Sequence, residues 1–322
     1  MKYYFFVNPV AGKGKNAHPL VEKIKGAFAD LGMEADYRIY RTEAVGDGTK
    51  KARALAENLK GEPARFYACG GDGTVNEIVN GIYGFEEASF GIVPIGSGND
   101  TVRNFPETGD FLDMKSQILA EEKPMDLMEY SGIIDGVQQT RYCVNMFNIG
   151  FDCDVVRMAA ELREKPLISG SLSYLMAIFG TFVKKEGISL DIVEDGKVLK
   201  QGKLLLCAIS NGSFCGGGIK SAPQSIVDDG IFDINMVKDV SRREFLKFLP
   251  YYQKGTHLNH PKVDEVLEIR TSKSLSVKPF GVDTMNICVD GEIEETCGID
   301  IRMIEKGIKI LLPAKNSLTG KN

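Results

Sequence analysis

The chain has 322 residues, 43% of them hydrophobic and 26% charged, and a formal net charge of −5. A chain of this length and composition can bury two cores of ordinary domain size, so we expect two domains. Its acidic balance lacks the positive field that non-specific nucleic-acid binding requires, which excludes nucleic acid as a partner.

The start of the chain and its cysteines bear on the cellular compartment. The apolar run Tyr3–Val7 is too short for the hydrophobic region of a signal peptide and is better explained as a first strand. The seven cysteines are scattered and never spaced as C-x-x-C. We therefore expect reduced core cysteines in a cytoplasmic protein, without a disulfide framework or a zinc site.

The first 125 or so residues alternate strand-like and helix-like patterns, which predicts helices packed on a mostly parallel sheet. Strands are expected at Lys2–Val7, Ala35–Tyr40, Arg65–Ala68 and Phe90–Val93. Between the strands, apolar residues recur at helical spacing, first at Leu20, Ile24, Ala27, Phe28 and Leu31. Each predicted helix thus has one apolar face that can pack on the sheet.

After Pro124 the pattern changes to short β-rich runs divided by turn signals, as at Ile188–Val193, Leu204–Ile209 and Ile231–Val237. This half is predicted to be a β-sandwich or barrel with two helical insertions.

The first insertion, Leu167–Val183, is uncharged but diluted by small polar residues, so a buried helix is expected rather than a membrane span; it could also line an acyl-chain crevice. The second, Arg242–Gln253, is locally cationic. It either lies at a membrane interface or, as the preferred interpretation, packs its apolar face on its own sheet.

Glycine-rich loops follow three of the predicted strands. Gly70–Thr74 lies between an apolar strand and a helix, which points backbone N–H groups and a helix N-terminus at an anion. Because Asp72 would repel a phosphate, we expect its carboxylate to bind Mg²⁺ or a ribose hydroxyl instead. Asn8–Lys15 and Pro94–Asp100 occupy corresponding strand ends, where ligands of open α/β sheets bind. Any one loop could be a simple turn, but the three together favour a nucleotide site.

The loops do not match two common nucleotide-binding motifs. G-x-x-x-x-G-K-[ST] does not occur, and no G-x-G-x-x-G follows the first strand. Walker-type ATPases and classical dinucleotide dehydrogenases are therefore disfavoured.

The chain resembles the diacylglycerol kinase catalytic superfamily, and within it the soluble bacterial lipid kinases, which are also similar to sphingosine kinases. The motifs that carry this resemblance are N-P-x-x-G-K-G at Asn8–Gly14, G-G-D-G-T at Gly70–Thr74, P-x-G-x-G-N-D at Pro94–Asp100, D-D-G at Asp228–Gly230 and D-G-E at Asp290–Glu292. G-G-D-G-T alone also occurs in NAD kinases, whereas the ordered set ending in D-G-E is specific.

The resemblance implies an α/β plus all-β fold with the active site in the cleft between two domains. Residues 1–125 would form a three-layer α/β ATP-binding domain, and the last strand, about 306–315, can return to it in such proteins. Residues 126–305 would form a β-sandwich domain that binds lipid and metal.

The resemblance also implies site residues. Nucleotide contacts are expected from Asn8, Gly12, Thr42, Gly70, Gly71, Asp72, Gly73, Thr74, Gly98, Asn99 and Asp100. Asp229 would bind a structural Mg²⁺ with the carbonyls of Ile226 and Ile231, linked through water to Asp126. Glu292 would be the general base, with Asp290 in the same catalytic motif.

Three departures from the family pattern are mild. Gly48 stands where a small helix former is usual, and Thr101 replaces an aromatic residue. Gln224 occupies a position near the metal loop that is often acidic or alanine, which leaves the metal affinity open.

The implied activity is transfer of the γ-phosphoryl group of ATP, with Mg²⁺, to a lipid hydroxyl, first of all diacylglycerol to give phosphatidic acid. A sphingoid base or another lipid alcohol is the alternative acceptor. An NAD kinase and a non-catalytic lipid-binding or regulatory protein on the same fold are the competing classes. The lipid would be met at a membrane surface by a cytoplasmic, peripherally associated protein, and the oligomeric state, a homodimer included, is open.

Without the resemblance, simpler interpretations stay open. Asp290-Gly291 and Asp228-Asp229-Gly230 are also ordinary turn sequences. His257 and His260 have helical ligand spacing but no evident third zinc ligand, so we favour a structural role for them.

Overall fold

The computed structural model describes residues 1–33, 37–163, 176–178, 180–181 and 187–314. It divides into two compact units. The first unit contains Met1–Met125 and the end of the chain from Lys306, and the second contains Asp126–Glu305. The chain passes from one unit to the other twice, each time within a strand.

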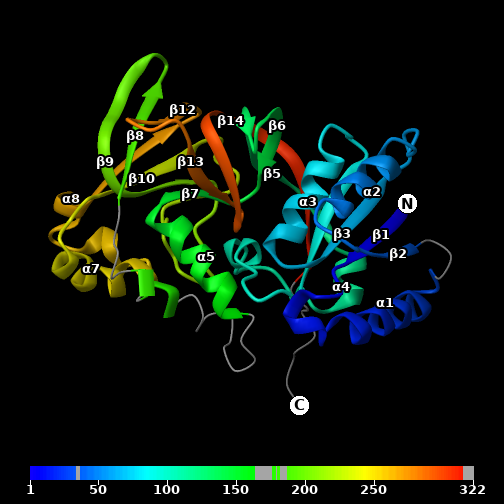
Figure 1. The fold of residues 1–322 in the computed structure, drawn as a ribbon. Coiled ribbons are helices and arrows are strands. Elements are labelled where there is room, and N and C mark those ends of the chain that lie inside the picture. Colours follow the sequence, from blue (N-terminus) through cyan, green and yellow to red (C-terminus); the bar gives the residue numbers. More distant parts are fainter. Residues whose placement is uncertain (34–36, 164–175, 179, 182–186, 315–322) are drawn as a thin grey trace. The chain divides into compact units, whose positions relative to one another are not determined.

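A parallel sheet forms the centre of the first unit (Figure 1). Its strands are β1 (Lys2–Val7), β2 (Tyr37–Arg41), β3 (Ala64–Gly70), β4 (Ala88–Pro94) and the end of β14 (Glu292–Leu312). Their order is β14-β4-β3-β1-β2, so the direction of the connections reverses between β1 and β3. Ligands of open α/β sheets bind at such a point, beyond the carboxyl ends of the strands.

Helices cover both faces of this sheet (Figure 1). On one face, α1 (Ala17–Leu31) and α4 (Met114–Ile118) share a core with Phe5 and Tyr67. The other face carries α2 (Asp47–Ala56) and α3 (Asp72–Ile82), which pack on each other. Two short 3₁₀ helices, η1 (Ala11–Gly14) and η2 (Thr101–Asn104), follow β1 and β4.

The second unit is built from antiparallel strands. They are β5 (Glu121–Ile134), β6 (Val137–Cys143), β7 (Met146–Gly150), β8 (Ile188–Glu194), β9 (Lys197–Ser210), β10 (Phe232–Lys238), β11 (Leu267–Ser272), β12 (Ser274–Pro279), β13 (Met285–Val289) and most of β14. The pairings β7-β9-β8-β12-β14-β13-β7 close a ring, with β10 and β11 continuing from β9, and β5 and β6 from β14. The ring encloses a core that includes Phe147, Ile209 and Ile287.

Helices pack on the outer face of strands β7, β9 and β10. They are α5 (Phe151–Arg163), α7 (Arg242–Lys254), η3 (His257–Asn259) and α8 (Val263–Val266). Helix α7 begins with a capping box made by Ser241 and Glu244 and ends at Gly255 in a left-handed conformation. Strand β9 therefore has apolar partners on both faces, which explains its continuous apolar run Leu204–Ile209.

The structure confirms the α/β and β-rich halves and several local expectations. Strand β1 has the predicted bounds, and β8 and β9 contain the predicted runs, while β10 begins one residue later than the predicted run Ile231–Val237. The apolar face of α7 (Phe245, Phe248, Leu249 and Tyr252) is buried in the second unit, so the preferred interpretation of this helix is confirmed.

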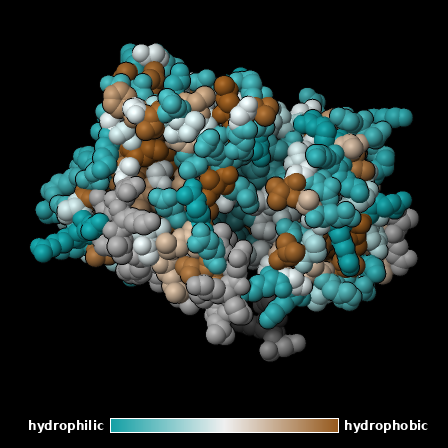
Figure 2. All heavy atoms as spheres, viewed as in Figure 1, coloured by the Kyte–Doolittle hydropathy of each residue, from teal (hydrophilic) through white to brown (hydrophobic). Residues whose placement is uncertain are grey.

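Other expectations need correction or lie outside the described residues. Six cysteines are buried, but Cys297 is exposed, because alternation along β14 turns it to the outside. Most of Leu167–Val183 lies outside the described residues. No helix within the described part of the chain is both long and apolar enough to span a membrane. On the face drawn in Figure 2, hydrophobic residues lie in several small groups among hydrophilic ones.

Candidate nucleotide and metal sites

Three loops at the carboxyl ends of β1, β3 and β4 contact one another. Asn8 donates from Nδ2 to Thr74 Oγ1 at 3.4 Å, which joins the first loop to the second. A Cβ on Gly12 would lie 2.6 Å from the carbonyl oxygen of Ile95, so the first loop also packs against the third. The structure thus brings together the predicted nucleotide-binding loops of the first unit.

Asp72, at the start of α3, joins the second loop to the third. Its Oδ2 accepts from Asp100 N at 3.1 Å. Its Oδ1 accepts from Thr101 N at 3.0 Å and from Thr101 Oγ1 at 2.9 Å. Both carboxylate oxygens are therefore engaged within the protein, which favours a loop-positioning role for Asp72 over the expected ribose or Mg²⁺ contact.

Glycines allow the second and third loops to approach closely. A Cβ on Gly96 would lie 2.4 Å from Gly71 Cα, and one on Gly70 would lie 2.1 Å from Thr74 Oγ1. Asn99 is left-handed, with a φ of 56°, and its side chain donates to the carbonyls of Pro94 and Gly96. The main chain is therefore bare where Gly71 precedes α3.

The segment that follows β2 is held by a residue whose role the sequence did not reveal. The carboxylate of Glu77, on α3, accepts from Gly46 N at 2.8 Å and from Gly48 N at 2.9 Å. A Cβ on Gly48 would lie 2.5 Å from Glu77 Oε2, which explains why glycine stands at this position. Thr42 N donates to Val7 O at 3.1 Å and so lies beside the end of β1.

The other residues predicted to contact the nucleotide lie near the start of α3. Gly73 lies in the first turn of α3, and Gly98 packs near Asp72 Oδ2. Asp100 is buried and forms an ion pair with Arg103, with Oδ1 and Nε 3.5 Å apart. Close main-chain approach and the N-terminus of α3 make the site suitable for an anionic group such as a phosphate.

The predicted metal loop lies in the second unit. Asp126 Oδ2 accepts from Gly230 N at 2.6 Å, so Asp126 contacts the main chain of the loop that carries Asp229. Asp229 Oδ1 accepts from Ile231 N at 3.2 Å. Burial raises the pKa of Asp229, and the nearby carboxylates of Asp126 and Asp228 raise it further.

A cation would relieve this concentration of negative charge, so the residues fit Mg²⁺ with oxygen ligands. Among the described residues, no three His, Cys, Asp or Glu side chains come together as a metal site. Binding here therefore needs main-chain carbonyls as well, as expected from Ile226 and Ile231.

The D-G-E motif forms a two-residue hairpin between β13 and β14. Asp290 and Gly291 have φ values of 48° and 96°, as a type I′ turn requires. The buried Asp290 carboxylate accepts from the backbone N–H groups of Val144, Asn145 and Met146 at 2.8 to 3.1 Å. Asp290 thus holds the turn, while Glu292 is exposed at the first position of β14.

The comparisons with known proteins extend over nearly the whole chain. Residues 2–130 match the diacylglycerol kinase catalytic domain, and residues 145–312 match the YegS C-terminal NAD kinase beta sandwich-like domain. A diacylglycerol kinase from Staphylococcus saprophyticus is 30% identical over 292 residues, which cover 88% of this chain and 87% of the relative. The chain belongs to the diacylglycerol kinase family. It is a lipid kinase, with ATP as its co-substrate and a lipid as its acceptor.

Solved structures agree with this fold. The crystal structure of a diacylglycerol kinase from Bacillus anthracis str. Sterne has a TM-score of 0.68 and 21% identity, and the match covers 97% of this chain and 96% of that one. Yeast NADH kinase, solved with NADH, has a TM-score of 0.54 and 13% identity over 98% of this chain and 84% of that one. At these identities the two structures support the fold alone. Membership of the diacylglycerol kinase family supports the predicted lipid kinase.

Proposed function

We propose that this lipid kinase phosphorylates diacylglycerol to phosphatidic acid. The family supports the lipid acceptor, and curated relatives that carry this name support diacylglycerol first. The single observation that carries the ATP-dependent reaction is the set of three interlinked loops at the carboxyl ends of β1, β3 and β4.

In the proposed reaction, the nucleotide phosphates lie against Gly70–Thr74 and the N-terminus of α3, with Asn8, Gly12, Thr42 and Gly98–Asp100 around them. Their negative charge is stabilised by main-chain N–H groups. Asp72 acts by holding the second and third loops together rather than by touching the phosphates.

Asp229, with Asp126 and the carbonyls of Ile226 and Ile231, would hold Mg²⁺ in the second unit. The ion would supply positive charge and order to this loop. Asp126 keeps the loop in place through the main chain of Gly230.

Glu292 is proposed as the general base. The lipid hydroxyl oxygen attacks the γ-phosphorus, the bond from the γ-phosphorus to the β–γ bridging oxygen breaks, and ADP leaves. The hydroxyl proton passes to the Glu292 carboxylate. The hydrogen bonds of Asp290 hold the turn that precedes Glu292. Asp290 is therefore proposed to position Glu292 and not to take the proton.

We also propose that the protein meets its lipid at a membrane surface. The outer face of α7 exposes Arg243 and Lys247 beside Leu246 and Tyr251. Cations with a few apolar side chains suit an anionic lipid surface.

The proposed reaction is tested with γ-labelled ATP, Mg²⁺ and mixed micelles of diacylglycerol, by measuring label in the lipid extract. Glu292→Gln should lower kcat by about 10²- to 10⁴-fold, because a general base is lost. Glu295→Gln removes another exposed carboxylate of β14 and is the matched control, expected to keep its kcat.

Three results would count against parts of the proposal. Unchanged kcat in Glu292→Gln would remove Glu292 as the base. Label in another lipid but not in diacylglycerol would change the acceptor, and label in no lipid would contradict the reaction.

A further inference from the structure

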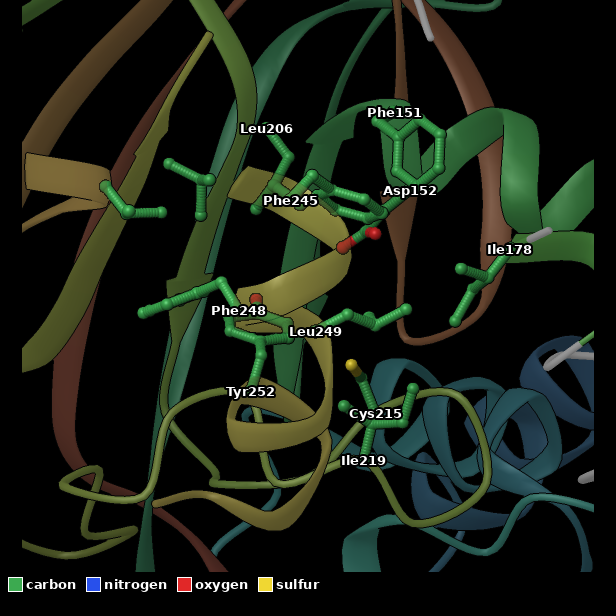
Figure 3. Close-up of a pocket in the computed structure, with 12 residues that line it drawn as sticks. Phe151, Asp152, Ile178, Leu206, Cys215, Ile219, Phe245, Phe248, Leu249 and Tyr252 are labelled. Atoms are coloured by element: carbon green, nitrogen blue, oxygen red, sulfur yellow. The ribbon is translucent and has the colours of Figure 1, made fainter. Parts of the chain in front are cut away.

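A pocket in the second unit lies between the inner face of α7 and strand β9 (Figure 3). Its walls are almost entirely apolar and include Phe151, Leu206, Phe245 and Leu249. The void is small, ≈ 30 Å³, enough for one or two water molecules. A longer ligand has to displace side chains, and the half-buried Ile219 marks where the pocket approaches solvent.

One carboxyl group breaks the apolar lining. Asp152, in the first turn of α5, is 7% exposed and points into the space framed by Phe245, Leu249 and Ile178 (Figure 3). None of the described residues forms a hydrogen bond or ion pair with its side chain. Burial raises its pKa to about 7.

An unpaired buried carboxyl destabilises a fold, whereas leucine at this position would fill a similar space without burying a polar group. A perturbed acid in an apolar pocket is typical of a functional position. Within the described residues, no structural partner accounts for the carboxyl of Asp152.

We propose that Asp152 is a specificity-determining residue: its protonated carboxyl donates a hydrogen bond to the ester carbonyl of a neutral lipid whose chain enters this apolar pocket. This inference rests on the proposed lipid substrate and deepens it. The neutral carboxyl suits an uncharged ester, whereas a cationic amine would require the carboxylate. The pocket should therefore prefer neutral acylglycerol esters to sphingoid bases.

Other titratable groups near Asp152 come from several elements. Cys153 lies on the same helix, Tyr252 on α7, Cys215 in the loop after β9 and Cys288 on β13. Burial raises the pKa of Cys153 to about 12 and those of Tyr252 and Cys288 well above their ordinary values. Cys153, Tyr252 and Cys288 are therefore neutral at pH 7.

Three further titratable groups complete the surroundings of Asp152. His257 touches the Tyr252 ring, and burial lowers its pKa, so it is uncharged at pH 7. Asp154 and Arg157 of α5 are half-exposed and face each other. Asp152 is thus the group expected to change charge near neutrality.

The test is a binding measurement with a fluorescent conjugated-polyene fatty-acid methyl ester, a neutral chain with an ester group, in the absence of ATP. For the unmodified protein, Kd should rise close to tenfold between pH 7.5 and 8.5, because binding requires the protonated carboxyl. Asp152→Asn still donates a hydrogen bond and should bind without this pH dependence. Asp152→Leu should bind more weakly at pH 6.

Two further variants test whether the pocket is the site. Ile219→Phe should fill the entrance and abolish binding, while Val198→Phe, at an exposed position of β9, should leave Kd unchanged. Both proteins are checked for folding by thermal unfolding.

A stability measurement separates a functional carboxyl from a structural one. The folded-state pKa of Asp152 exceeds its ordinary 3.8, so the folded protein holds the proton better and loses stability as pH rises from about 4 to 7. Asp152→Asn should therefore raise Tm, and more at pH 8 than at pH 5. A structural carboxyl would give a lower Tm instead.

The inference is overturned if Kd of the unmodified protein does not change with pH, if Ile219→Phe binds normally, or if an alkylamine binds more tightly than the ester. Label transfer to diacylglycerol with any of these results would leave the proposed reaction intact. Normal probe binding without label transfer would instead contradict the reaction alone.

Discussion

At the residue scale, Asp72 joins two of the glycine-rich loops through its carboxylate. Its three hydrogen bonds reach Asp100 and Thr101, and the Thr101 hydroxyl supplies one of them. Threonine at position 101 replaces the aromatic residue of the family pattern, and its hydroxyl adds a hydrogen bond to Asp72 that an aromatic hydrocarbon side chain could not form. The charge of Asp72 is compensated by main-chain N–H groups, which keeps it compatible with a nearby phosphate.

Asp72→Asn should weaken ATP binding. The amide would place an NH₂ group against one of the N–H donors, leaving a buried donor unpaired at about 1–3 kcal/mol and loosening the third loop. We expect KM for ATP to rise roughly tenfold or more, corresponding to about 1.4 kcal/mol or more, with a smaller change in KM for the lipid.

Thr101→Val is the graded comparison for Asp72→Asn. It removes only the hydroxyl bond to Oδ1, so its KM for ATP should lie between those of the parent and Asp72→Asn. Equal KM values in all three proteins would contradict a loop-positioning role.

At the scale of elements, two loops of the proposed nucleotide site approach each other closely. Gly96→Ala would place a methyl group 2.4 Å from Gly71 Cα, so the backbone must shift. We expect a loss of roughly 1–3 kcal/mol in the free energy of unfolding and a raised KM for ATP.

Gly26→Ala is the matched control for Gly96→Ala. Gly26 lies in α1, where nothing stands within 4 Å of an added Cβ, so alanine should stabilise the helix by about 0.5–1 kcal/mol. Its KM for ATP should not change. Urea unfolding and steady-state kinetics on both variants check these values, and a Gly96→Ala protein with parental KM would be inconsistent with the close packing.

Local patterns in the sequence were sufficient for most elements. Apolar runs predicted the strands at Lys2–Val7 and Leu204–Ile209, and the pattern of apolar residues predicted the helix after Ser241. The ring of strands in the second unit was not predictable in detail, because the pairings of β7 with β9, β8 with β12 and β13 with β7 join segments far apart in the chain. The uncharged segment before Gly187 lies mostly outside the described residues.

The same limit applies to the candidate sites. Motifs located the three glycine-rich loops, but the partners of Asp72 and Glu77 lie 28 to 31 residues away in the sequence. Asp152 stands in an ordinary helical pattern, and only the surrounding helix and strands reveal its burial. Long-range contacts of this kind leave no local signal.

At the scale of the molecule, both connections between the two units run inside strands, β5 and β14. Strand β14 adds residues to both cores: Ile301 and Met303 belong to the second, and Leu311 to the first. We expect the units to unfold in one cooperative transition, because losing either core removes support from a shared strand.

Cooperative unfolding can be measured because the chain has no tryptophan. Tyr37→Trp reports on the first unit and Tyr251→Trp on the second, and their urea transitions should coincide. Insertion of Gly-Ser-Gly between Glu305 and Lys306 should separate the two midpoints. Separate transitions without the insertion would contradict the predicted coupling.

The links among the three glycine-rich loops also bear on the rate of ATP binding. Asn8 donates to Thr74 and Thr101 N donates to Asp72, and Gly48 N, in the segment after β2, donates to Glu77; these hydrogen bonds need no nucleotide as a partner. The loops therefore need little ordering when a nucleotide arrives. Association should be a single fast step whose observed rate grows linearly with ATP concentration, and selectivity among nucleotides should appear mainly in how slowly each one leaves.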